Sequence, residues 1–465
     1  MKKRVFIITL MVMLFTFICA KAEETSYLVK FKAEYQPYAQ RYNITVVNEQ
    51  AGIYLADSEE LPNIPEEYIE YSEPNEKVSL IEGIPTISLF GASDQYYSQQ
   101  WHLQMINGES SWAYGAYGND VKVAVIDSGC YPHNDLRGNL LPGKNYLDGS
   151  SNTTDENGHG THVSGIIAAE MNSIGICGVA PKAKIVPLKC FGETKEGDME
   201  DTIEAIYDAV DVYGCQVINM SWGGTGNNRF LKAAIDHAYS KGAILVAAVG
   251  NESSTALNYP AAYQNVIGVG SVTKDKEKSD FSQYNNSVTV VAPGEDVPST
   301  FNNGRYVYGS GTSQATPFVS GIAAVALSMD PTLTNGRFSA YLKSTATDLG
   351  TEGYDTSFGS GLVNEAALLE HIQKSLKNYS SPINVNGTDA TVVVKNNNTT
   401  RLIAISFIAQ YGEDDVFLGG HYTKVNLLPG ESTTVSVKTQ NPDRISHMLW
   451  NMQTLAPLNT EREKR

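Results

Sequence analysis

The chain has 465 residues, 42% of them hydrophobic, and its formal net charge is −17. This length is enough for two or three domains, and the composition is that of a globular protein. The acidic balance argues against nucleic acid as a partner, because nucleic-acid binding needs a basic surface, and it favours a protein that tolerates or binds cations.

The N-terminal segment has the pattern of a secretory signal peptide. The cationic residues 2–4 precede an apolar run over residues 5–19, and Ala20-Lys21-Ala22 is a small-x-small cleavage site. The alternative is a membrane anchor, but fifteen apolar residues are short for a span, and no later segment is long enough to cross a bilayer. We therefore expect residues 1–22 to be removed and the protein to be exported without a membrane span.

Four cysteines follow this segment: Cys130, Cys177, Cys190 and Cys215. An even number in an exported protein permits disulfides, in any of three connectivities. Four buried free thiols are an equally good interpretation, because each cysteine lies in an apolar or strand-like context. No CxxC pair is present, which argues against a structural zinc site.

Residues 23–93 predict a small α+β unit. Residues 26–32 and 52–56 have strand patterns, and residues 36–42 can form a short helix. The unit ends in a segment, residues 82–95, with the composition of a linker.

Residues 94–378 alternate between strand and helix patterns. Helical segments at 199–212 and 229–241 lie among apolar, β-rich runs at 121–126, 185–188, 217–220 and 243–248. This alternation predicts an α/β domain with a parallel sheet that is covered by helices on both faces. The active sites of such sheets lie at the C-terminal ends of the strands.

The last part of the chain changes character again. Residues 379–458 are rich in Thr, Val and Asn, and their strand patterns predict a small all-β sandwich. Residues 459–465 are charged, and we expect a frayed tail there.

Three polar residues mark the ends of predicted elements in the α/β region. Asp127 directly follows the strand at 121–126, where a carboxylate can also cap a turn. His159 and His162 are spaced as a metal pair can be, but no HExxH pattern or third ligand accompanies them. Ser313 joins a glycine-rich loop to a helical run, and by itself it is most simply an N-cap.

The order Asp, His, Ser is one of the orders known for catalytic triads. Five segments around these residues resemble the motifs of the subtilisin-like serine proteases (subtilases, peptidase S8 family): Val123–Gly129, His159–Gly165, Asn219–Gly223, Ala247–Asn251 and Gly311–Pro317. The resemblance covers residues 94 to about 375. It implies a secreted bacterial serine endopeptidase that acts on protein or peptide substrates through an acyl-enzyme.

The resemblance assigns a role to each of four residues. Ser313 is the nucleophile and His159 is its general base, while Asp127 orients the imidazole and stabilises the imidazolium. The side chain of Asn251 and the backbone N–H of Ser313 form the oxyanion hole.

The resemblance also implies how a substrate binds. An extended peptide pairs with the edge at Ser221 and, on its other side, with residues 195–197, so that backbone hydrogen bonds supply most of the affinity. Six residues are assigned to substrate binding: Ser221, Trp222, Gly223, Gly250, Glu252 and Asn258. In the S1 pocket, Glu252 would favour a polar or basic P1 side chain, and Asn258 would narrow a site that is often Gly in relatives.

A structural Ca²⁺ site is a further implication of the resemblance. Its ligands would be the side chains of Asp94, Asp135 and Asn172, with backbone carbonyls of Glu170, Ile174 and Ile176. Hard cations prefer such mixed oxygen shells. The alternative is a set of solvated acids beside an Asn turn.

Residues 23–93 resemble a subtilase pro-region, which would make the protein a zymogen with its own intramolecular inhibitor. A folding aid suits a parallel sheet, because sheets of this kind fold slowly. We expect cleavage between Ile84 and Asp94; the alternative is a simple N-terminal extension.

A catalytically silent binding or adhesion protein on the subtilase fold is the alternative function. The filled catalytic positions argue against the silent form. An adhesive role for the sandwich at 379–458 stays open beside simple packing against the protease.

Overall fold

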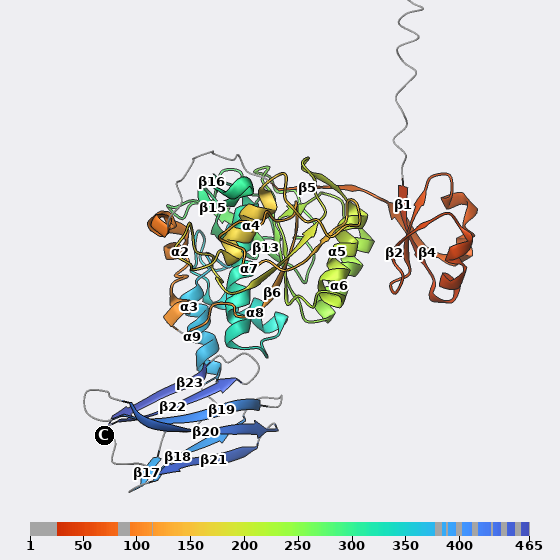
Figure 1. The fold of residues 1–465 in the computed structure, drawn as a ribbon. Helices are drawn as coiled ribbons and strands as arrows, with labels where there is room; N and C mark the ends of the chain where they lie inside the picture. Colours follow the sequence, from red (N-terminus) through yellow and green to blue (C-terminus); the bar gives the residue numbers. More distant parts are fainter. Residues whose placement is uncertain are drawn as a thin grey trace, which may run out of the picture.

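The computed structural model describes residues 26–81, 94–113, 115–376, 384–386, 389–396, 402–411, 417–428, 431–438, 444–451 and 457–464. They form an N-terminal α+β unit, a large α/β domain and a C-terminal β domain. Figure 1 shows the N-terminal unit and the β domain on different sides of the α/β domain. The expected signal peptide, residues 1–22, and most of the expected linker, residues 82–93, lie outside the described residues.

The N-terminal unit is a four-stranded antiparallel sheet in the order β2-β3-β1-β4. Its elements are β1 (Ser26–Phe31), η1 (Ala33–Arg41), β2 (Thr45–Asn48), β3 (Ile53–Asp57), η2 (Leu61–Asn63), η3 (Glu66–Tyr68) and β4 (Ile69–Pro74). The helix that we expected at 36–42 is the 3₁₀ helix η1, and it contains Pro37. A proline has no N–H to donate, which disfavours a regular α-helix at this point.

The central sheet confirms the predicted α/β architecture. Its seven strands are all parallel, in the order β14-β13-β12-β10-β6-β8-β7. They are β6 (Lys122–Asp127), β7 (Lys144–Asn145), β8 (Lys184–Lys189), β10 (Val217–Met220), β12 (Ile244–Ala248), β13 (Ile267–Val272) and β14 (Val290–Pro293).

Helices cover both faces of this sheet. Along β6, Val123 and Val125 pack in one hydrophobic cluster while Ala124 and Ile126 pack in another, because successive strand side chains point to opposite faces. The first cluster includes α4 (His159–Ala168) and α7 (Thr312–Met329), and the second includes α5 (Met199–Asp211) and α6 (Arg229–Ser240). The remaining elements of this domain are η4 (Asp94–Gln99), α2 (Trp101–Met105), α3 (Ser110–Ala113), β15 (Val297–Phe301), η5 (Asn302–Gly304), β16 (Arg305–Gly309), α8 (Asn335–Thr345) and α9 (Glu365–Leu376).

Helix α7 begins at Thr312, so that Ser313 lies inside its first turn and Pro317 lies within the helix. Pro317 has no N–H for the carbonyl four residues earlier, which is that of Ser313. Ser221 Oγ donates a hydrogen bond to this carbonyl oxygen instead, at 3.0 Å. The side chain at the end of a central strand thus completes the first turn of α7.

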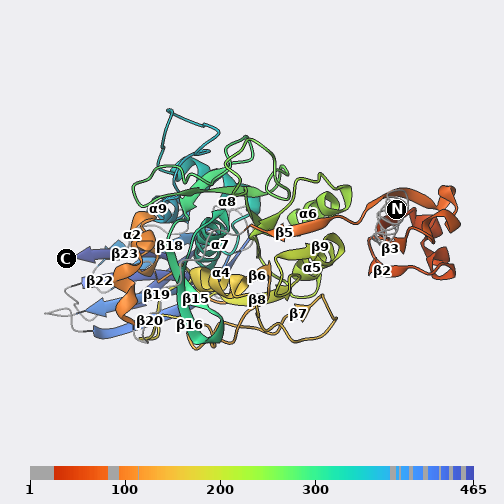
Figure 2. The ribbon, with the colours of Figure 1, turned by 90° about the horizontal axis from the view of Figure 1, so that it is seen from above.

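A segment that follows the N-terminal unit adds a strand to the α/β domain. Strand β5 (Lys77–Leu80) pairs antiparallel with β9 (Glu196–Asp198) on one side and with β11 (Trp222–Gly223) on the other. In Figure 2 β5 leaves the N-terminal unit and runs onto the α/β domain beside β9.

The C-terminal part contains the additional antiparallel β domain that the sequence predicted. One sheet has the order β17-β18-β21 and the other β20-β19-β22-β23. The strands are β17 (Asn384–Asn386), β18 (Asp389–Lys395), β19 (Leu402–Tyr411), β20 (Phe417–Leu427), β21 (Ser432–Lys438), β22 (Arg444–Asn451) and β23 (Pro457–Lys464). Strand β23 occupies most of the expected tail, and its pairing with β22 gives partners to backbone groups there.

None of the helices in the described part of the chain combines the length and apolar character that a membrane crossing requires.

Candidate active site

A buried acid and an imidazole meet at the C-terminal end of β6. Asp127 is the last residue of β6, and His159 is the first residue of α4. Their Oδ1 and Nδ1 atoms are 2.8 Å apart, and the two side chains are almost completely buried. Asp127 Oδ1 also accepts hydrogen bonds from the backbone N–H of Ser128, at 2.7 Å, and from its hydroxyl, at 3.3 Å. The same carboxylate oxygen thus contacts the imidazole and accepts both hydrogen bonds from Ser128.

A second buried acid shapes the turn that leads into α4. Asp155 Oδ1 accepts from the backbone N–H groups of Asn157 and Gly158, and Oδ2 accepts from the N–H and the hydroxyl of Thr161. Burial raises the pKa of Asp155, and these hydrogen bonds oppose that shift. Gly158 has a φ of 101°, which favours glycine. Asp155 therefore holds the backbone on both sides of His159.

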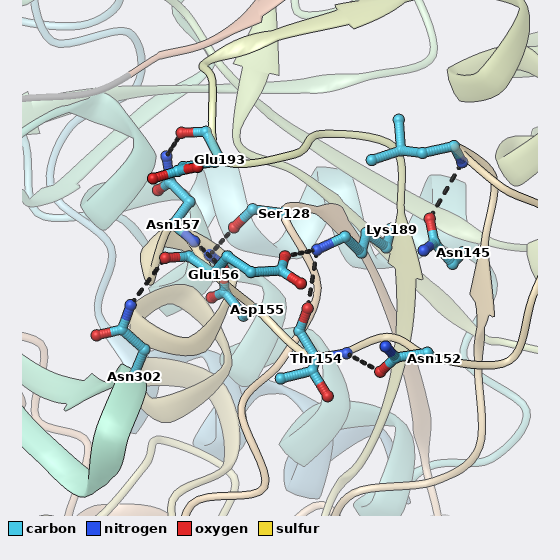
Figure 3. Close-up of polar contacts among 12 residues, drawn as sticks. Ser128, Asn145, Asn152, Thr154, Asp155, Glu156, Asn157, Lys189, Glu193 and Asn302 are labelled. Atoms are coloured by element: carbon cyan, nitrogen blue, oxygen red, sulfur yellow. Dashed lines mark hydrogen bonds and ion pairs between the residues drawn. The ribbon is translucent and has the colours of Figure 1, made fainter.

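Figure 3 shows the outer contacts of the same turn. The ammonium group of Lys189 bonds to the carbonyl of Thr154 at 2.8 Å and to the carboxylate of Glu156. Asn302 Nδ2 donates to the carbonyl of Glu156 at 3.0 Å. Because Lys189 ends the strand beside β6, these contacts tie the turn to the sheet.

The hydroxyl of Ser313 lies at the same edge of the sheet. Ser313 is fully buried, and its Oγ donates to the carbonyl oxygen of Ser221 at 3.3 Å. Asn219 Nδ2 donates to Ser221 Oγ at 3.0 Å, and Ser320 Oγ donates to Asn219 Oδ1 at 2.8 Å. This chain of bonds fixes the start of α7 against the end of β10, and α7 packs against α4, which carries His159.

Asn251 has an amide that is held at one end and directed at a carbonyl with the other. Its Oδ1 accepts from the backbone N–H and from the hydroxyl of Thr312, both at 2.9 Å. Its Nδ2 donates to the carbonyl oxygen of Ile81 at 3.4 Å. The geometry is that of a side-chain donor that is oriented before it meets the carbonyl.

The peptide that carries this carbonyl is an extended segment of the chain itself. Leu80 N–H donates to the carbonyl of Lys195 at 2.9 Å, and Ile81 N–H donates to the carbonyl of Ser221 at 3.2 Å. Leu80 lies opposite Trp222 in the strand register. The two edges that we predicted to bind a peptide therefore lie on either side of β5.

Two of the residues assigned to substrate binding, Gly223 and Asn258, lie close to Ile81. A Cβ atom placed on Gly223 would lie 3.1 Å from Ile81 Cδ1 and 3.6 Å from Asn258 Cβ. A Cβ atom on Gly250 would overlap the amide nitrogen of Asn258, so Asn258 packs directly behind Gly250. Asn258 is buried, whereas Glu252 is exposed.

The loop at 170–176, which contains most of the expected calcium ligands, packs against Asp135. Glu170 N–H donates to the carbonyl of Asp135 at 2.7 Å, and Ile176 N–H donates to its Oδ2 at 2.9 Å. Asn172 Oδ1 accepts from the N–H of Ile174 at 3.0 Å. Asp94 begins η4, but its side chain lies outside the described residues.

This set of groups fits a hard cation by its chemistry, because every proposed ligand atom is an oxygen. Gly175 allows the loop to lie close to Asp135, because a Cβ atom at this position would lie only 2.4 Å from Asp135 Oδ2. The described residues contain no cluster of three His, Cys, Asp or Glu side chains that could hold a metal. A cation here would therefore depend on amide and carbonyl oxygens as well as on the carboxylate.

The remaining candidates fall outside this chemistry. His162 Nε2 lies 3.1 and 3.3 Å from the carbonyl oxygens of Val297 and Val307, so the contacts of its ring are with backbone and not with a metal partner. The four cysteines, which the sequence left open, are all free and buried: Cys130, Cys177, Cys190 and Cys215.

Sequence reasoning missed three residues that support the site, Thr312, Asp155 and Ile81. Thr312 directly precedes Ser313, and Asp155 lies four residues before His159. This closeness in sequence to a predicted catalytic residue was the only signal that could have identified them. Nothing in the sequence linked Ile81 to Asn251, which is 170 residues away.

A parallel-sheet domain with an aspartate–histidine pair at a strand end and a serine at a helix start is the arrangement expected of a serine hydrolase. The family model described as the subtilase family, peptidase S8, matches residues 118–361. The chain belongs to this family and is a subtilisin-like serine protease.

Known relatives agree with this assignment. The chain is 35% identical to the M-protease of Shouchella clausii over 329 residues, which cover 70% of this chain and 84% of that protein. It is 38% identical to the minor extracellular protease Epr of Bacillus subtilis over 270 residues, 58% of this chain but only 41% of Epr. A solved structure of a protease from Pseudoalteromonas arctica has 32% identity and a TM-score of 0.56, and the match covers 60% of this chain and 98% of that one.

Proposed function

We propose that the protein is a secreted serine endopeptidase that is made as a zymogen. The supporting observation is the contact between Asn251 Nδ2 and the carbonyl oxygen of Ile81, because it presents a peptide bond of the chain to an oxyanion donor. The extracellular protease named among the relatives supports export.

The mechanism follows from the roles of three side chains. Ser313 Oγ attacks the carbonyl carbon of the bound peptide bond, and His159 takes the hydroxyl proton at Nε2. Asp127 holds the Nδ1 side of the imidazole and stabilises its protonated form. The C–N bond then breaks, His159 protonates the leaving amine, and a water molecule hydrolyses the acyl-enzyme by the same route in reverse.

Two donors stabilise the tetrahedral intermediate. One is the amide of Asn251, which Thr312 orients, and the other is the backbone N–H of Ser313 in the first turn of α7. Donors fixed in advance need no reorganisation when negative charge develops on the carbonyl oxygen, which is why they lower the barrier.

In this proposal residues 23–93, which comprise the N-terminal unit and β5, act as a pro-region that blocks the site. Strand β5 fills the position between β9 and β11 where a substrate strand would pair. A substrate must displace this segment, so the intact chain is inhibited until the segment is cut and leaves.

The test compares the purified wild-type chain with Ser313→Ala. We expect the wild type to cleave itself and to digest casein, and we expect Ser313→Ala to stay intact with kcat lowered about 10⁶-fold. Ser339→Ala on α8, remote from the site, is the matched control and should behave as the wild type does.

The alternative, a catalytically silent binding or adhesion protein, gives a different result. In that case the wild type would digest nothing, and it would remain uncut after prolonged incubation. Cleavage of both the wild type and Ser313→Ala would instead indicate processing by another protease.

We also propose that a Ca²⁺ ion stabilises the catalytic domain. The side chains of Asp94, Asp135 and Asn172 and the carbonyls of Glu170, Ile174 and Ile176 would hold it. The support is the packing of the 170–176 loop on Asp135 and the all-oxygen character of the set. The role of the ion is structural, because it lies outside the residues that handle the peptide bond.

A further inference from the structure

We propose that the chain cleaves itself at the Ile81–Glu82 bond, and that the pocket holding Ile81 selects short, branched apolar P1 side chains. This inference rests on the proposed protease function and specifies its processing site and substrate class. It places the cleavage before the interval from Ile84 to Asp94 in which we expected it from the sequence.

The backbone contacts assign the bond. The carbonyl oxygen of Ser221 accepts two hydrogen bonds, one from the N–H of Ile81 at 3.2 Å and one from the hydroxyl of Ser313 at 3.3 Å. The nucleophile and Ile81 therefore share one acceptor. Ile81 directly follows the last residue of β5. Asn251 Nδ2 donates a hydrogen bond to the carbonyl oxygen of Ile81. The oxyanion donor thus contacts the carbonyl of Ile81, and the nucleophile is hydrogen-bonded to the acceptor that binds the N–H of the same residue. The register of β5 is fixed on both sides, so no earlier carbonyl of the strand has this position.

The reaction at this bond balances as an ordinary hydrolysis. A bond forms between Ser313 Oγ and the carbonyl carbon of Ile81, and the bond to the nitrogen of Glu82 breaks. His159 passes the serine proton to that nitrogen, which leaves as the new N-terminal amine. Water then releases Ile81 as a C-terminal carboxylate and restores the serine.

The side chains of β5 show what the site accepts on the P side. Val78, Leu80 and Ile81 are 1%, 5% and 8% exposed, whereas Lys77 and Ser79 are exposed. Val78 and Leu80 lie on one face of the strand and pack in the same cluster as Trp222. The site therefore accommodates apolar residues at P4, P2 and P1 and leaves the P3 side chain exposed.

A buried pair of amides limits the P1 pocket. Asn258 Nδ2 donates to Gln283 Oε1 at 2.6 Å and to the carbonyl of Val249 at 3.1 Å. Gln283 Nε2 donates to the carbonyl of Ala256 at 2.8 Å. Both amides are at least 96% buried, and they fill the space behind Gly250.

A long P1 side chain would have to displace this pair and leave buried amide groups without partners, which is costly. A lysine would in addition bring a charge beside these neutral, buried amides. The basic preference expected from the sequence depended on Glu252, which is exposed. The geometry instead favours isoleucine and valine.

The first experiment reads the C-terminal residue of the N-terminal fragment that the purified full-length chain releases, by mass spectrometry at early times. We expect a fragment ending at Ile81. Ile81→Asp should slow self-cleavage at least about 10-fold, whereas the matched change Leu89→Asp, inside the interval from 84 to 94, should leave the rate unchanged.

A first fragment whose C-terminal residue lies beyond residue 83 would overturn the assignment. Equal slowing of self-cleavage by Ile81→Asp and Leu89→Asp would overturn it too. If such a fragment still depends on Ser313, the proposed protease function stands while this inference fails. If no fragment depends on Ser313, the proposed function itself fails.

The second experiment measures kcat/KM of the activated enzyme on peptides that carry Val-Ser-Leu-X before the cleaved bond. We expect X = Ile or Val to exceed X = Phe or Lys by at least about 10-fold. Asn258→Gly should raise the value for Phe relative to Ile, because it opens the pocket. A wild-type preference for Phe or Lys would contradict the inference whether or not the Asn258 variant folds.

Discussion

At the residue scale, Asn251 and Thr312 come from two different motifs and together make up one part of the proposed oxyanion hole. The amide can donate to a carbonyl only if it does not rotate, and Thr312 fixes its oxygen with two hydrogen bonds of 2.9 Å. The hydroxyl of Thr312 is itself an acceptor for the N–H of Gly250, at 3.2 Å. In the proposed mechanism, Thr312 is therefore a positioning residue that acts on the reaction through Asn251.

We expect Thr312→Val to lower kcat about 3- to 10-fold with KM nearly unchanged. The change keeps the shape and the backbone N–H but removes one hydrogen bond to Asn251 Oδ1, and a single bond of this kind is worth about that factor. KM is spared because the oxyanion contact strengthens mainly in the transition state. The measurement is steady-state kinetics on a soluble peptide substrate.

The matched control is Thr312→Ser, which restores the hydroxyl and should restore kcat. A loss of the same size in both variants, or a loss that appears in KM alone, would show that the threonine serves packing or substrate binding. Thermal unfolding of both variants separates these effects from a general loss of stability.

Residues of this kind mark the limit of inference from sequence. Asp127, His159, Ser313 and Asn251 were identifiable because each lies in a short motif at an element end. The contact of Asn251 with Ile81 joins positions 170 residues apart, and it depends on how β5 lies between two edges. Its existence follows from tertiary packing, which no local pattern encodes.

At the scale of elements, the strands of the central sheet were predictable because they are apolar on both faces. The start of α7 was placed at Ser313 from the junction of a glycine-rich loop and a helical run, and the helix begins one residue earlier, with polar side chains in its first turn and Pro317 in its second. The helix begins at Thr312 because Ser221 supplies the donor that Pro317 lacks. Similarly, β23 forms where a charged tail was expected, because β22 offers an edge with which it can pair.

The loop at 170–176 carries a prediction at this scale. If a Ca²⁺ ion ties the loop to Asp135, chelation should lower the stability of the domain. A ligand at 100 times its Kd contributes about 2.7 kcal/mol, so we expect a fall in Tm of several degrees on adding EGTA. The measurement is thermal unfolding of the Ser313→Ala protein, which cannot digest itself.

The variant Asp135→Asn should remove this response to EGTA, whereas Asp148→Asn, the same change in an exposed loop, should retain it. An unchanged Tm of the parent protein with and without EGTA would show that the loop needs no ion. This comparison with the parent remains decisive even if Asp135→Asn does not fold.

At the scale of the whole molecule, the N-terminal unit rests on the starts of two helices. Glu73 bonds to the backbone N–H and the guanidinium of Arg229 in α6, and Asn75 accepts from the N–H of Glu200 in α5. The rings of Tyr71 and Phe230 lie 4.8 Å apart at the same contact. Because β5 follows this contact immediately, the docking of the unit sets the register in which Ile81 reaches Asn251.

The sequence predicted that three units exist but could not predict this docking. It depends on single side chains that recognise helix ends across the chain, and such contacts leave no periodic pattern. The boundaries of the units were visible because composition changes at each of them.

The α/β domain also contains buried histidines that make its stability depend on pH. Burial lowers the pKa of His102, in α2, to about 3, and repulsion from His162 adds to this shift. The pKa of His162 is about 3 for the same main reason, with repulsion from His159 as the second cause. In the unfolded chain both imidazoles titrate near pH 6.5.

The sign of the effect follows from proton binding. Between pH 6.5 and 3 the unfolded chain binds protons that the folded chain refuses, so the free energy of unfolding decreases as the pH falls. Each imidazole with these two pKa values removes up to about 3 kcal/mol by pH 4. We expect His102→Gln to lose clearly less stability than its parent between pH 7 and pH 4, because glutamine stays neutral.

The experiment is denaturant unfolding at several pH values in the Ser313→Ala background. His371→Gln is the control, since His371 is an exposed residue of α9. The free energy of unfolding of the control should depend on pH as that of the parent, Ser313→Ala, does. For His102→Gln this free energy should change less steeply with pH at every pH between 4 and 6. If it changed equally with pH in all three proteins, His102 would accept a proton in the folded state without cost. The acid sensitivity of the domain would then have to come from other groups.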